Sequence, residues 1–199
     1  MRREDTIPFL SEFLTVRPAP MLEYFRAWCE HRQRYHRPFD EYGCRIDHLS
    51  YKCVSVREYE DIRSRFEEHL DGWRASRFIH QSIISGRRVA VIGLVDPIQT
   101  ALGALRVLEL SEPKPMRAEA YGYDHLEVAV RNVQLRIAAE VFSAVPKATG
   151  EPGVFVLKDR PHHATWDAAM PGDEARGWPP FILRLTSEPL AVKIGHEML

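Results

Sequence analysis

Two histidines and one glutamate have side chains that divalent metals prefer. His48 and His125 each lie in an Asp-His-Leu tripeptide, and Glu109 lies between them in a segment of alternating apolar residues. Neutral imidazoles and a carboxylate suit Fe²⁺, Mn²⁺, Ni²⁺ or Zn²⁺, with coordination positions left for water or substrate. We therefore predict a metal site formed by His48, Glu109 and His125.

Strand periodicity predicts that these side chains share one face of a sheet. In the strand expected at 44–56, Leu49 and Tyr51 form an apolar face, so His48 points the opposite way. Alternation in the other expected strands places four more side chains opposite their apolar neighbours: Glu109, His125, Glu127 and Lys193. Buried charges need partners or a ligand. We expect Glu127 to be a general base or an alternative ligand, and Lys193 to bind a substrate carboxylate or phosphate or to pair with a glutamate.

The elements that would position these residues repeat along the chain. A helical segment at 8–31 and a polar loop at 32–43 come first. A strand, an amphipathic helix and three strands follow, expected at 44–56, 56–70, 73–84, 88–95 and 104–113. A second strand and helix are expected at 120–130 and 131–145, followed by strands at 154–158, 181–187 and 190–196 with an irregular passage at 159–180. The order is βαβββ twice.

The repeat divides the chain into three parts that act as one functional domain. These parts are an N-terminal helical extension (1–43), a first module (44–115) and a second module (116–199). The passage 159–180 is either a lid or a disordered insertion. Its adjacent His162 and His163 are expected to be solvated.

Composition excludes several classes of protein. The 27 Lys and Arg residues balance 28 Asp and Glu residues, so a broadly basic nucleic-acid binder is not expected. No run approaches the roughly 20 apolar residues of a membrane-spanning helix. Three cysteines are too few for a disulfide scaffold, and the first residues lack the apolar run of a signal peptide. We expect a cytoplasmic protein.

Four segments carry a resemblance to known proteins. Tandem βαβββ modules with His or Glu on their first and last strands resemble the vicinal oxygen chelate superfamily, which includes glyoxalase I, extradiol dioxygenases, methylmalonyl-CoA epimerase and antibiotic-resistance proteins. Within it, the segments are similar to the YecM-like branch of bacterial proteins: DHLSYKC (47–53), VLELSEPKP (107–115), YDHLEVAV (123–130) and LAVKIGH (190–196). The resemblance covers residues 44–196, preceded by the helical extension.

The resemblance implies an α+β fold in which the two modules form a cupped mixed sheet around one metal. Two metal positions would be left for a small substrate that binds through two oxygens, and a homodimer would be compatible with it. His48, Glu109 and His125 match three ligand positions. The fourth falls on Lys193, whose protonated amine cannot bind a metal, so a two-His, one-Glu site is implied.

The sequence leaves the function open between classes. One interpretation is a metal-dependent isomerase, lyase or dioxygenase. Another is a metal-free small-molecule-binding protein of the same fold, in which aromatic side chains stack on the ligand; the candidates are Trp73, Phe78, Trp166 and Trp178. A third is an interaction protein without activity.

Overall fold

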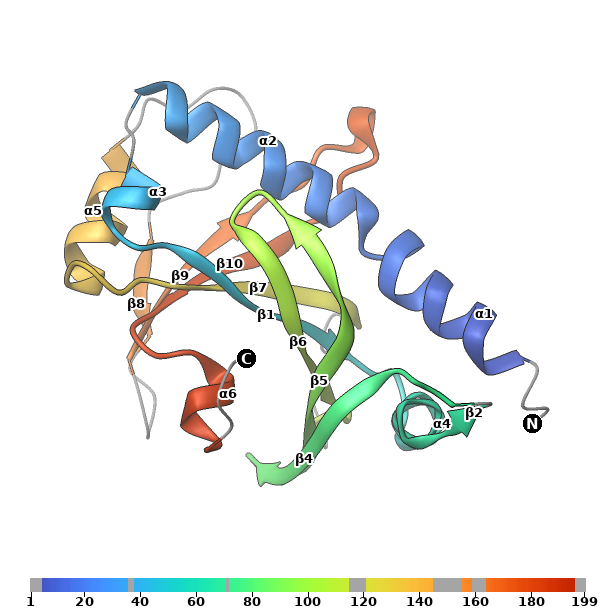
Figure 1. Ribbon diagram of the computed structural model, residues 1–199. Helices are drawn as coiled ribbons and strands as arrows, with labels where there is room; N and C mark the ends of the chain where they lie inside the picture. Colours follow the sequence, from blue (N-terminus) through green and yellow to red (C-terminus); the bar gives the residue numbers. More distant parts are fainter. Residues whose placement is uncertain are drawn as a thin grey trace.

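The computed structural model describes residues 5–35, 38–70, 72–114, 121–144, 155–158 and 164–195 (Figure 1). The N-terminal part contains α1 (Thr6–Ser11), a π-helix (Glu12–Val16), α2 (Ala19–Tyr35) and α3 (Pro38–Glu41). The next part contains β1 (Arg45–Lys52), α4 (Val56–Glu67), β2 (His69–Leu70), β3 (Trp73–Arg74), β4 (Ser76–Ile84), β5 (Arg87–Thr100) and β6 (Gly103–Ser111). The last part contains β7 (Gly122–Ala129), α5 (Leu135–Ala144), β8 (Val156–Lys158), β9 (Thr165–Met170), β10 (Phe181–Thr186) and α6 (Leu190–Lys193).

Eight strands form one mixed sheet in the order β4-β5-β6-β1-β7-β10-β9-β8. The antiparallel pair β1 and β7 lies at the centre. Each of these strands has on its other side the last strand of its own βαβββ unit, in parallel: β6 beside β1, and β10 beside β7. The predicted α+β class with tandem βαβββ units and a mixed sheet is confirmed.

The two faces of the sheet have different partners. Leu49 and Tyr51 of β1 belong to a large apolar core that includes Phe13 and Phe25 from the N-terminal helices. Val107 of β6 points to the opposite face, where it packs in a small cluster with Val91 and with Ala191 of α6. The N-terminal helices therefore cover one face, and α6 lies on the face that carries His48 (Figure 1).

The N-terminal helices extend further than expected. The predicted loop at 32–43 is wrong, because α2 continues to Tyr35 and α3 follows at Pro38–Glu41. Arg32 is only 2% exposed, and its guanidinium lies 5.5 Å from the Trp28 ring centroid. This basic residue therefore packs on the helix instead of marking a solvated connector. No helix in the described ranges is both long and apolar enough to span a bilayer.

Three other predicted boundaries are wrong. β5 continues through Asp96 and Pro97 to Thr100, since its pairing with β6 is irregular between Gly93 and Ile98 and Pro97 needs no ladder bond there. The passage 159–180 contains β9, which pairs with β10. The expected strand at 190–196 is instead the helix α6 at Leu190–Lys193, because β7 and β9 already occupy both edges of β10.

An ion pair between β5 and the end of β6 should make stability depend on pH. Glu112 accepts hydrogen bonds from the Arg88 backbone N–H (2.8 Å) and Nε (2.7 Å). Burial raises the pKa of Glu112, but these bonds and the Arg88 charge outweigh it and lower the pKa below 4.5. A depressed carboxyl pKa stabilises the folded state above pH 4.5, and this contribution is lost as pH falls.

We expect Glu112→Gln to lower the free energy of unfolding by about 1 kcal/mol at pH 7 and by much less near pH 3. Urea denaturation at both pH values measures this difference. Glu174→Gln, at an exposed position, is the matched control. An equal loss at both pH values would show that the carboxylate charge is not what stabilises the pair.

Candidate metal centre

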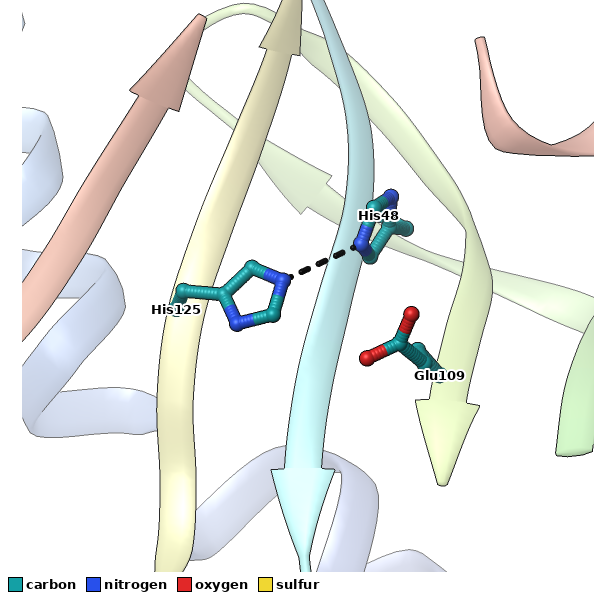
Figure 2. A group of neighbouring side chains, drawn as sticks. All are labelled: His48, Glu109 and His125. Atoms are coloured by element: carbon teal, nitrogen blue, oxygen red, sulfur yellow. Dashed lines mark hydrogen bonds between the residues drawn. The ribbon is translucent and has the colours of Figure 1, made fainter. Parts of the chain in front are cut away.

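Three side chains from adjacent strands converge on the face of the sheet that carries α6. His48 comes from β1, Glu109 from β6 and His125 from β7 (Figure 2). One ligand atom of each lies within 4.8 Å of the other two. The two Nε2 atoms are 3.3 Å apart, close to the roughly 3.4 Å between two imidazole nitrogens bound tetrahedrally to one ion.

The aspartate before each histidine determines which ring nitrogen faces this point. Nδ1 of His48 lies 2.9 Å from Oδ2 of Asp47, and Nδ1 of His125 lies 3.0 Å from Oδ2 of Asp124. A carboxylate only accepts hydrogen bonds, so each Nδ1 carries the proton and each neutral ring keeps its lone pair on Nε2, at the centre. This carboxylate–histidine arrangement is typical of metal ligands. In each Asp-His-Leu tripeptide, the aspartate therefore orients the histidine that follows it.

The orienting groups are themselves held by further contacts. Both carboxylate oxygens of Asp47 accept from the backbone N–H of Leu190, at 3.0 and 3.1 Å. Asp124 pairs with Nζ of Lys52 at 3.0 Å. Ser50 donates its hydroxyl to Oε1 of Glu109 at 2.9 Å. Each orienting carboxylate therefore has a second partner on another part of the chain.

The electrostatic surroundings of the two imidazoles differ. At His48 burial lowers the pKa, but the carboxylates of Glu127 and Asp47 outweigh it and raise the pKa to about 9. At His125 burial and the Arg184 guanidinium lower the pKa. At Glu109 burial raises the pKa, yet His125, His48, the Ser50 hydroxyl and Arg184 together outweigh it and the pKa is lowered. The carboxylates beside His48 therefore favour a positive charge on or near this ring.

Arg184 is the site residue that sequence reasoning missed. β10 lies beside β7 in the same way that β6 lies beside β1. In the first module Glu109 of β6 is the cross-strand partner of Ser50. In the second module Arg184 of β10 is the cross-strand partner of Glu127. The counterpart of Glu109 in the second module is therefore Arg184 on β10, and the assignment of that position to Lys193 is wrong. The alternation in FILRLT was the available signal, because Arg184 stands between Leu183 and Leu185, which are both buried.

The other two predicted residues also reach the centre. Glu127 is 3% exposed, and its carboxylate lies 3.8 Å from Nε2 of His48. Lys193 projects from the helix α6, where Nζ donates to Oγ1 of Thr186 at 3.0 Å and lies 3.9 Å from Oε1 of Glu127. All five predicted residues are thus brought together, while His162 and His163 fall outside the described residues.

The aromatic side chains expected to stack on a ligand have other partners. Trp73, Trp166 and Trp178 pack against the large core beneath the opposite face of the sheet. Trp178 stacks on Tyr24 with ring centroids 4.7 Å apart. Phe78 packs against the small cluster that includes Ala191 of α6. The expectation of a stacking platform formed by these four residues is therefore wrong.

Two βαβββ units joined through their first strands, with the candidate site on β1, β6 and β7, give the fold that the resemblance to the vicinal oxygen chelate superfamily implies. The family model described as "YecM protein" matches residues 29–164. The chain therefore belongs to the YecM family.

One curated protein and several solved structures are similar to this chain. Protein YecM of Escherichia coli strain K12 is 23% identical over 116 residues, and the match spans 58% of each chain. The chain thus covers little more than half the length of this curated relative. A solved structure described as "Structural Genomics, Protein EC4020" superposes with a TM-score of 0.56 at 16% identity, covering 90% of this chain and 94% of that one. Methylmalonyl-CoA epimerase of Streptomyces coelicolor gives a TM-score of 0.36 at 19% identity, covering 72% and 98%.

Proposed function

We propose that the protein binds one divalent metal through His48, Glu109 and His125. The observation that carries this proposal is the pair of Nε2 atoms, 3.3 Å apart and both deprotonated when the rings are neutral, because each Nδ1–H is engaged by an aspartate. Glu109 supplies the third donor atom within 4.8 Å. Two imidazoles and one carboxylate fit Fe²⁺, Mn²⁺, Ni²⁺ or Zn²⁺.

The charges around the centre also favour a divalent cation. Asp124 and Lys52 form an ion pair and neutralise each other. Among the other charged side chains near the centre, the carboxylates outnumber the basic groups by two. The four carboxylates are Asp47, Glu109, Glu127 and Asp167, and the two basic side chains are Arg184 and Lys193. Buried net charge is costly. A divalent ion would neutralise this excess.

We propose that the site acts on a small substrate that binds through two neighbouring oxygens, in isomerase, lyase or dioxygenase chemistry. A bound metal would polarise those oxygens. Glu127 is placed to move a proton, because its carboxylate lies on the same face as His48 and is held between Arg184 (3.5 Å) and Lys193 (3.9 Å). Lys193 would neutralise Glu127 or a substrate carboxylate. Both modules contribute ligands, so neither would form the site alone.

A second candidate function is metal-free binding of a small molecule. The hydrogen bond from Nη1 of Arg184 to Nε2 of His125, at 2.9 Å, favours it. This bond occupies a lone pair that a metal would need. The cytoplasmic localisation, the homodimer and the absence of nucleic-acid and membrane partners stay predictions.

Metal analysis of protein purified without a histidine tag tests the proposal. We expect roughly one ion per chain after incubation with Fe²⁺, Mn²⁺, Ni²⁺ or Zn²⁺, together with a higher melting temperature, because a ligand that binds only the folded state stabilises it. Less than about a tenth of an ion per chain and no thermal response would contradict it. Stabilisation by small metabolites that is insensitive to metals and chelators would support the metal-free alternative.

A further inference from the structure

We infer that Arg184 selects the substrate of this centre by hydrogen-bonding an anionic oxygen. The ligand class is a small carboxylate with a second oxygen on the adjacent carbon, as in 2-hydroxy and 2-oxo acids. The inference rests on the proposed function, because it concerns the oxygen ligand of the proposed metal. Arg184 is the residue of the second module that occupies the position equivalent to Glu109.

The position of Arg184 makes the centre asymmetric. Glu109 on β6 places a carboxylate beside β1, whereas Arg184 on β10 places a guanidinium beside β7. A guanidinium has five N–H donors and cannot bind a metal. The coordination positions on the β10 side are therefore left for exogenous ligands, and a permanent cation lies beside them.

Asp167 holds this guanidinium in one orientation. Nε of Arg184 donates to Oδ1 of Asp167 at 2.9 Å, and Nη2 donates to Oδ2 at 3.1 Å. The two residues are direct cross-strand partners on β10 and β9. Such a bidentate pair fixes the plane of the guanidinium. Nη1 is consequently directed away from Asp167 and toward the centre.

The two N–H groups of Nη1 have acceptors that belong to the centre. One acceptor is Nε2 of His125 at 2.9 Å, and the other is Oε2 of Glu127 at 3.5 Å. If a metal takes the His125 lone pair, the first N–H loses its acceptor while remaining next to that ligand atom. A buried donor without an acceptor is costly. An oxygen bound beside His125 would restore the bond, and an anionic oxygen would form the stronger, charge-assisted version.

The test compares two probes that differ by one charge, glycolate and glycolamide. Protein loaded with the tightest-binding of the four metals is titrated with each by calorimetry. We expect the wild-type protein to bind glycolate more than about tenfold more tightly, because the metal favours a carboxylate and the charge-assisted hydrogen bond adds about tenfold. In Arg184→Gln this preference should fall about tenfold, to what the metal alone provides, while metal affinity is retained or increased because a cation near the ion is removed.

Three further variants test whether a lost preference for glycolate reflects the missing guanidinium or a folding defect. Arg136→Gln, which removes an exposed guanidinium on α5, should keep the preference for glycolate. Arg184→Lys should keep part of it, because the charge remains but the bidentate geometry is lost. If Arg184→Gln alone does not fold, the double variant Asp167→Asn, Arg184→Gln avoids an unpaired carboxylate and is used in its place.

The outcomes distinguish this inference from the proposed function. A wild-type protein that binds no metal would overturn both. A wild-type protein that binds metal but shows no preference for glycolate would overturn only the inference about Arg184. The same holds if the preference persists undiminished in Arg184→Gln, or if that folded variant loses metal binding.

Discussion

His48→Ala is expected to weaken metal binding by at least about 100-fold. The substitution removes one of the three proposed donors and leaves Nε2 of His125 without its neighbour at 3.3 Å. Loss of a group that merely orients a ligand already lowers metal affinity 10- to 100-fold, and loss of a ligand should cost more. Competition between the protein and a chromogenic chelator, for each of the four metals, measures the change.

The control for this variant is His69→Ala, at an exposed position on β2. It should leave metal affinity unchanged, which would also exclude adventitious binding to surface histidines. His125→Ala should reproduce the loss seen in His48→Ala. If His48→Ala stays folded and retains wild-type affinity, the ligand assignment is wrong.

Phe142→Ala is expected to lower the free energy of unfolding by about 3–5 kcal/mol, the range for deleting a buried aromatic side chain. Phe142 on α5 is 1% exposed. Its ring centroid lies 5.3 Å from that of Phe39, 5.9 Å from that of Trp28 and 6.3 Å from that of Phe155. Replacement by Ala would leave a cavity between the N-terminal helices and the second module. Chemical denaturation followed by tryptophan fluorescence measures the loss.

Ile137→Ala is the matched control for this variant, because Ile137 lies on the same helix and is 39% exposed. It should change stability by less than about 1 kcal/mol. A loss of similar size in both variants would mean that α5 contributes through helix propensity and not through packing. A large loss in Phe142→Ala alone would show that the N-terminal extension is part of the folded core.

The repeat of two modules could be predicted because its signals are local. Alternation in β1 places Leu49 and Tyr51 on the apolar face, and the structure buries both in the large core. The same alternation predicted that His48 lies on the opposite face, where it meets His125. The Asp-His-Leu repeat belongs to the two strands that pair at the centre of the sheet.

The errors concern features that depend on distant strands. β9 is a short strand with weak alternation, and its pairing with β10 could not be inferred from its own residues. Residues 190–196 alternate like a strand, but β10 has no vacant edge, so Leu190–Lys193 forms a helix on the face of the sheet. The position of Arg184 beside the centre does not follow from a sequence in which 190–196 is predicted to be the last strand of the module.

The sequence by itself determined the types of side chain at the centre and the face of each strand on which they lie. These follow from neighbours one or two positions apart, to which strand periodicity applies. Only the tertiary structure decided that the two Nε2 atoms meet at 3.3 Å and that a guanidinium occupies the position equivalent to Glu109. Register and edge occupancy decide both, and they depend on pairing between segments far apart in the chain.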